Sequence, residues 1–125
     1  PDSIKNIFMI DKNTKKFLNP KLVSDFASYY FGKQEKLRLD DKLIKGKVIM
    51  MALPGIAACH EFKKIVECYY PASIVVTSDT KMKSDQIKKF IDENDQKALI
   101  LTSEANVLGF TNDKIDTIIN CKGGE

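Results

Sequence analysis

The sequence is poor in the residues from which metal and catalytic centres are most often built. It has one histidine, His60, and three cysteines, Cys59, Cys68 and Cys121, among 125 residues. Cys59 and His60 are adjacent, so on a helix they point to different faces, which argues against a shared metal or a cysteine–histidine nucleophile pair. We expect His60 to be a solvated helix residue. An odd number of cysteines without paired spacing predicts reduced thiols and a cytoplasmic location.

The chain also has no phosphate-binding loop. None of its six glycines is followed by the Lys-Ser/Thr pair of the GxxxxGK[ST] motif, which surrounds the phosphates of a nucleotide and holds its magnesium ion. No apolar run approaches the roughly 20 residues that a transmembrane helix needs, and no signal peptide or lipidation motif is present. We therefore expect no ATP hydrolysis by this chain alone and no membrane partner.

What is present fits one domain with a proper core. Apolar residues make up 43% and charged residues 30%, as in ordinary globular proteins. The net charge of +3 and the pI of about 8.7 permit nucleic-acid binding without indicating it by themselves. The chain begins without Met and stops soon after an apolar segment, so we expect both ends to be cuts in a longer protein.

The first part of the chain predicts a short strand, a polar turn, a helix and a charged linker or short exposed helix. Their expected bounds are 3–10, 11–16, 19–31 and 33–47. Asn19 is the expected N-cap of the helix, Pro20 its first residue and Gly32 its end. The side chains that this helix is expected to bury are Leu22, Val23, Phe26 and one of Tyr29 and Tyr30. Residues 1–45 are either an interdomain linker or an extension that packs on the domain of residues 46–125.

From residue 46 onward, apolar runs alternate with amphipathic segments. The runs are continuous, as in strands buried on both faces, and the segments between them have helical spacing. The expected strands are 47–53, 73–77, 97–102 and 115–120, and the expected helices are 56–70 and 84–92. Ser84 is the expected cap of the second helix. The alternation predicts an α/β fold: a RecA-like (Rossmann-like) three-layer domain with a mainly parallel sheet.

Ligands of such sheets bind at the carboxyl ends of the strands, where this chain has three loops. Pro54-Gly55 leads into a helix N-terminus, whose free N–H groups favour an anion. Serines and threonines follow two further strands, and their hydroxyls can position a phosphate backbone without reading bases. The predicted nucleic-acid-binding residues are Pro54, Gly55, Ser78, Thr80, Thr102 and Ser103. The alternative is that these residue types are simply what turns and caps require.

Two groups of charged residues lie near the second helix. Asp92, Glu93 and Asp95 are expected to solvate its end. Four lysines either contact phosphates or form a solvated helix face. They are Lys81, Lys83, Lys88 and Lys89.

The order of these pieces resembles the second RecA-like lobe of superfamily-2 helicases. The resemblance covers about residues 45–121 and rests on KVIMMALPGIAACHEFKKIVE, SIVVTSDT and IKKFIDENDQKALILTSEANVLGFTNDKIDTIIN. It is closest to the motor subunits of type I and type III restriction enzymes and to related phage helicases. Ala52–Gly55 matches the end of the motif IV strand and Thr77–Thr80 the next strand end. Thr102-Ser103 matches the start of motif V, and Gly109 its glycine.

The resemblance implies a fragment of an ATP-dependent DNA or RNA helicase or translocase. ATP and Mg²⁺ would be bound mainly by the first RecA-like lobe of the same protein. This lobe would contact the nucleic-acid backbone and complete the ATP cleft through Gly109 and Thr111. Thr111 stands where the family usually has Asp, and the motif VI arginines are not in this chain. The alternative is a small non-catalytic α/β binding or interaction domain.

Overall fold

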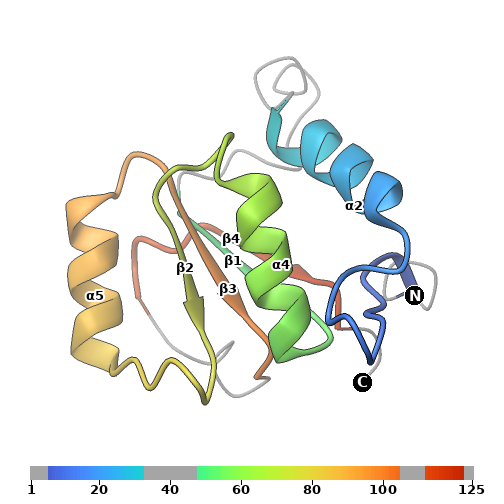
Figure 1. The fold of residues 1–125 in the computed structure, drawn as a ribbon. Helices are drawn as coiled ribbons and strands as arrows, with labels where there is room; N and C mark the ends of the chain where they lie inside the picture. The colour runs from blue at the N-terminus through green and yellow to red at the C-terminus, as the bar shows by residue number, and fades with distance from the viewer. Residues whose placement is uncertain (1–5, 33–47, 105–111, 123–125) are drawn as a thin grey trace.

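The structure is a computed structural model that describes residues 6–32, 48–104 and 112–122 (Figure 1). The N-terminal part contains the helix α2 (Pro20–Ala27) and a π-helical turn, η1 (Ser28–Gly32). The elements that follow are β1 (Val48–Ala52), α4 (Ile56–Val66), β2 (Ser73–Val76), α5 (Ser84–Glu93), β3 (Ala98–Thr102) and β4 (Thr117–Asn120).

The four strands form one parallel sheet in the order β2-β3-β1-β4. Their last residues are level, because Thr102 lies opposite both Ala52 and Val76, and Ala52 also lies opposite Asn120. The loops that follow all four strands therefore begin at the same edge of the sheet, which we call the carboxyl edge. The opposite edge, where the strands begin, is the amino edge.

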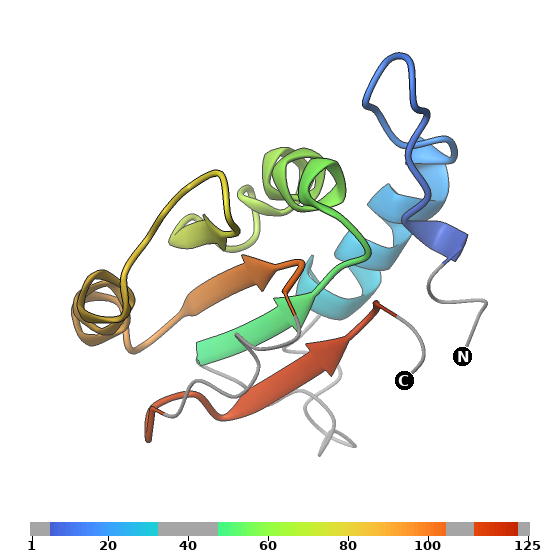
Figure 2. The same ribbon diagram turned by 90° about the horizontal axis from the view of Figure 1, so that it is seen from below.

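Helices cover both faces of the sheet. Every residue of β1 and of β3 is buried, as the continuous apolar runs predict. Alternate residues face two separate cores. One core joins Ile49, Met51 and Leu101 to α4 and α2, and the other joins Met50 and Ile100 to α5. Figure 2 shows α2 and α4 close together and α5 apart from them. The predicted three-layer α/β fold with a parallel sheet is confirmed.

The strand expected over residues 3–10 is wrong in its described part. Residues 6 and 7 are helical, and Ile10 makes only an isolated bridge to Phe17. A tight turn explains this, because the Asp11 carboxylate accepts the backbone N–H groups of Asn13 and Thr14 at 2.7 and 3.0 Å. The turn expected over 11–16 is thereby confirmed.

The N-terminal segment shares the core of the sheet. The ring of Phe8 lies 5.2 Å from that of Phe26 and 5.6 Å from that of Phe62 on α4, both edge-to-face. Such pairs contribute about 0.5–1.5 kcal/mol beyond area burial. Residues 6–32 therefore pack on this domain, while the segment 33–47 lies outside the described residues.

The first helix buries most of the expected stripe. It begins at Pro20 as predicted, and its fully buried residues are Val23, Ala27 and, in η1, Phe31. Phe26 and Tyr30, one of the two tyrosines expected there, are partly buried against the same core, as predicted. Leu22 is half exposed, which corrects its assignment to the core.

The N-terminal segment closely approaches the turn after α4 at Gly32, the last residue of η1. A Cβ at Gly32 would lie 2.7 Å from the ring of Tyr69, so only glycine fits there without a shift of that side chain.

Three predicted element ends also shift. α4 ends at Val66, short of the expected residue 70, and β4 begins at Thr117 because a turn with an Ile115 N–H to Asn112 O bond precedes it. Ser84 is the first residue of α5 and not its cap. The Gln86 side chain caps this helix instead, accepting the Lys83 N–H at 2.8 Å.

Candidate functional site

Hydrogen bonds tie the strand-end loops together at the carboxyl edge. Leu53 donates its N–H to the Thr102 carbonyl at 2.8 Å, which joins the ends of β1 and β3. The Ser78 N–H donates to the Glu104 carboxylate at 3.2 Å, which joins the loops after β2 and β3. The structure thus brings Pro54-Gly55, the loop after β2 and the beginning of the loop after β3 to one place.

The turn at Pro54-Gly55 leads into an open helix N-terminus. Gly55 is the N-cap of α4, with extended backbone and no capping side chain. A Cβ at this position would meet no atom within 4 Å among the described residues. Within the described residues no side chain caps the first turn of α4, as the predicted anion contact requires, while Ala58 in that turn is buried.

Two of the four predicted hydroxyl groups are used inside the protein. Thr102 is fully buried, and its hydroxyl accepts the Glu104 N–H at 3.1 Å. The Thr80 hydroxyl donates to the Thr77 carbonyl at 2.9 Å and accepts the Thr77 N–H at 3.0 Å. Both threonines fix the shapes of their loops and do not present a hydroxyl to a ligand in this structure.

The two serines keep their hydroxyls available. Ser78 is exposed and Ser103 is half-buried. Within the described residues their bonds run through backbone atoms, the Ser78 N–H and the Ser103 carbonyl, and neither hydroxyl has a partner. Of the predicted polar side chains at the carboxyl edge, Ser78 and Ser103 are therefore the ones that a phosphate can reach.

Sequence reasoning missed three hydrogen-bonded side chains beside these serines. His60 Nε2 lies 2.9 Å from Asp79 Oδ2, and the Thr77 hydroxyl donates to the other oxygen of Asp79. The bond from Thr77 chiefly, and the His60 ring in addition, hold the pKa of Asp79 below its usual value. His60 is thus an ion-pair partner, not simply a solvated residue. Two features of the sequence could have indicated this contact: His60 lies five residues after Gly55 in α4, and Asp79 lies just after β2.

The thiols behave as the sequence predicts. All three cysteines are free, Cys59 and Cys121 are buried, and Cys68 is exposed. Burial raises the pKa of Cys59 and of Cys121 to about 12. Cys59 is buried while His60 is partly exposed, as two faces of one helix require.

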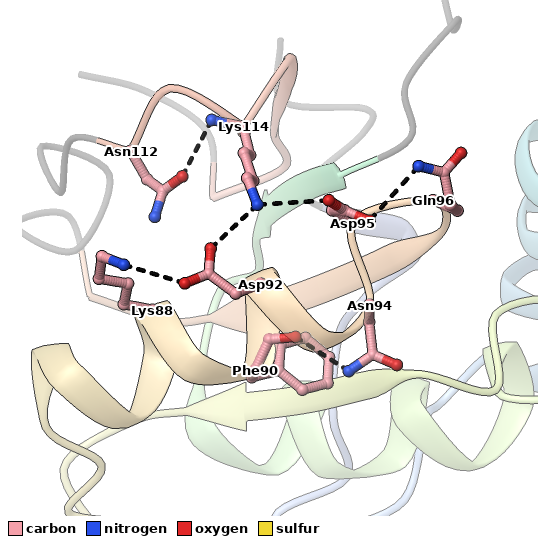
Figure 3. Close-up of polar contacts among 8 residues, drawn as sticks. All are labelled: Lys88, Phe90, Asp92, Asn94, Asp95, Gln96, Asn112 and Lys114. Carbon is pink, nitrogen blue, oxygen red and sulfur yellow. Dashed lines mark hydrogen bonds and ion pairs between the residues drawn. The ribbon is translucent and has the colours of Figure 1, made fainter.

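The acidic residues at the end of α5 do more than solvate that end, which corrects the expectation. Lys114 Nζ lies 3.1 Å from Asp92 and 3.3 Å from Asp95, so one ammonium bridges two carboxylates at the amino edge (Figure 3). Lys88 adds a bond of 2.9 Å to Asp92. The contacts fix the entry to β4, because the Lys114 N–H also donates to the Asn112 side chain at 2.9 Å.

Two of the four lysines singled out near α5, Lys88 and Lys89, lie on its solvated face. Lys88 pairs with Asp92, and Lys89 lies 4.0 Å from Glu93. An open groove of about 610 Å³ runs beside them and includes Asp85, Asn112 and Lys114 in its lining. The acidic partners of Lys88 and Lys114 neutralise their charges, so these groups do not favour a phosphate.

Gly109 and Thr111, the predicted contacts to a nucleotide, lie outside the described residues. Among the residues that are described, no group of three or more His, Cys, Asp or Glu side chains is placed to hold a metal ion. No helix in the described ranges is both long enough and apolar enough to span a membrane. No protein-family model, characterised protein or solved structure matches the chain.

Proposed function

We propose that this chain is the second RecA-like lobe of a superfamily-2 helicase or translocase, and that its carboxyl edge contacts the backbone of DNA or RNA. The observation that carries the proposal is the level ending of β1, β2 and β3, which sets an open helix N-terminus beside two available serine hydroxyls. Neutral donors in this arrangement suit phosphate oxygens and carry no base specificity.

The described residues have distinct tasks in this proposal. The first turn of α4 offers backbone N–H groups to one phosphate, and Ser78 and Ser103 donate hydroxyl hydrogens to neighbouring phosphates. The hydroxyls of Thr80 and Thr102 bond within their own loops and fix the conformation of these loops. His60 and the Thr77 hydroxyl hydrogen-bond to Asp79 and hold its carboxylate in place.

The catalytic cofactors belong to the other lobe in this proposal. The resemblance places ATP and Mg²⁺ mainly on the first RecA-like lobe. Hydrolysis of ATP there would supply the energy. The chain lacks the phosphate loop that would hold them. No catalytic step is therefore assigned to its residues, and their part is to hold the strand.

The test is binding of a fluorescent single-stranded oligonucleotide to the 125-residue chain, followed by anisotropy at several salt concentrations. We expect weak binding that falls as salt rises. Replacement of both Ser78 and Ser103 by alanine removes two hydroxyl donors and should weaken binding about tenfold, at about 0.5–1.5 kcal/mol per hydrogen bond.

The matched control replaces Ser24 and Ser28, on α2 and η1, and should bind as the native chain does. Absence of any binding by the native chain at low salt would favour the other candidate, a small α/β interaction domain. Equal loss in both double variants would point to non-specific attraction instead of a site at the carboxyl edge.

A further inference from the structure

A lysine that the sequence did not single out lies across the carboxyl edge. Lys122 follows β4, on one side of β1, and its ammonium group donates to the carbonyl of Ser103, after β3 on the other side of β1. The bond is 2.8 Å long and part-buried. The side chain therefore crosses the end of β1, where the Pro54-Gly55 turn begins.

The same ammonium group lies near a buried thiol. Burial chiefly, and the charge of Asp79 in addition, raise the pKa of Cys59, while the positive charge of Lys122 lowers it. Cys59 belongs to α4, so Lys122 lies near the beginning of that helix and on the same edge as Asp79.

Among the described residues, no opposite charge is paired with Lys122. Of the carboxylates on the same edge, Asp79 is bonded to His60, and Glu104 accepts the Ser78 N–H. Within the described ranges Lys122 has no ion pair, and its ammonium makes one bond, to a carbonyl. An ammonium carries three donors, and partial burial of a cation without a counterion is unfavourable. Among the described residues, two donors and the charge of this ammonium group are thus without a partner.

We propose that Lys122, together with the hydroxyl of Ser103, binds a backbone phosphate of a nucleic-acid strand. This inference rests on the proposed function and adds to it the charged contact that the neutral donors lack. A compact ammonium on a flexible stem suits a phosphate oxygen as a point charge, without base recognition.

A structural role for Lys122 makes a different prediction. If its only task were to bond the Ser103 carbonyl, loss of the charge with retention of a donor would change nothing. Lys122→Gln is that variant, because its amide keeps an N–H donor. Lys122→Met removes both the donor and the charge, and Lys122→Arg keeps both.

The experiment measures the affinity of the 125-residue chain for a single-stranded oligonucleotide over a range of salt concentrations, with a thermal melt for each variant. Loss of one phosphate contact should reduce the slope of log K against log salt by about 0.7. We expect this reduction, with about a three- to tenfold weaker affinity at low salt, for both Lys122→Met and Lys122→Gln. Lys122→Arg should stay within about twofold of the native chain.

Lys21→Met is the control, since Lys21 lies exposed on α2 and, among the described residues, pairs only with Asp25. Native binding with an unchanged slope in Lys122→Gln would overturn the inference and leave the proposed function standing. Equal slope changes in Lys21→Met and Lys122→Gln would also overturn it, because net charge would then explain both. No binding by the native chain would overturn both proposals.

Discussion

At the residue scale, the same side-chain types serve opposite purposes at one edge of the sheet. Thr80 and Thr102 bond their own loops, while Ser78 and Ser103 keep their hydroxyls available. The sequence predicts all four as phosphate contacts, because hydroxyls after parallel strands commonly meet there. The sequence cannot show which hydroxyls bond their own loop and which stay available. That difference depends on loop geometry over two or three residues, which residue type does not determine.

Lys114 illustrates a contact that neither composition nor periodicity predicts. Its two acidic partners lie 22 and 19 positions earlier in the sequence and meet it only because α5 and the entry to β4 lie side by side. A charge run in the sequence predicts solvation by default. Only the fold shows that Asp92 and Asp95, two residues of this charge run, share one cation.

This bridge makes a prediction about pH. Lys88 chiefly, with Lys114, lowers the pKa of Asp92, and Lys114 chiefly lowers that of Asp95. A carboxyl pKa that is lower in the folded chain stabilises it above the ordinary value of 3.8, and this contribution is lost as pH falls through the lowered values. The pKa of Lys114 is raised above 10.5, so its contribution is present below that pH and is lost as pH rises through the raised value.

Lys114→Met should therefore raise the pKa of Asp95 toward 3.8 and that of Asp92 by less, because Lys88 remains beside Asp92. Carboxyl carbon chemical shifts, followed by NMR from pH 6 to about pH 2, measure both values. Lys21→Met should leave them unchanged. An Asp95 pKa that does not move in Lys114→Met would show that the bridge does not form in solution.

At the scale of elements, long periodic segments are predicted well and their ends are not. The buried strands β1 and β3 and the helices α4 and α5 all lie where the sequence places them. The strand predicted over residues 3–10 is wrong in its described part. Phe8 packs in an aromatic core there, and Asp11 bonds the backbone of the turn that follows. Local side-chain bonds compete with secondary structure in short segments, and no count of apolar residues reveals this.

The start of α5 gives a test at this scale. Gln86→Ala removes the side chain that accepts the Lys83 N–H and should lower the free energy of unfolding by about 0.5–1.5 kcal/mol. Ser84→Ala, at the residue that sequence reasoning takes as the cap, should change it by less than about 0.5 kcal/mol. Urea denaturation of both variants measures the two values, and a larger loss for Ser84→Ala would contradict this account of the cap.

At the scale of the whole molecule, Phe62 joins the N-terminal segment to the sheet domain. It is fully buried on α4, and its ring lies 5.6 Å from Phe8 and 6.0 Å from Phe31. The sequence leaves open whether residues 1–45 are a linker or a packed extension. In the structure, residues 6–32 pack on the sheet domain through long-range aromatic contacts, which a sequence pattern does not encode.

The two edges of the sheet differ in their chemistry. At the amino edge, Lys88 and Lys114 are paired with Asp92 and Asp95. The carboxyl edge, in its described part, has an uncapped helix start, two serine hydroxyls without a partner, and Lys122. The central claim is that a nucleic-acid backbone binds at the carboxyl edge.

Titration of a single-stranded oligonucleotide into the ¹⁵N-labelled chain, followed by amide chemical shifts, tests that claim most directly. We predict that the largest salt-sensitive shifts fall on the carboxyl edge, at Gly55, Ile56, Ser78, Ser103 and Lys122. The amides of Gln96, Lys97 and Lys114 at the amino edge should move little. Shifts concentrated at the amino edge or on α2, or none at all at low salt, would contradict the claim.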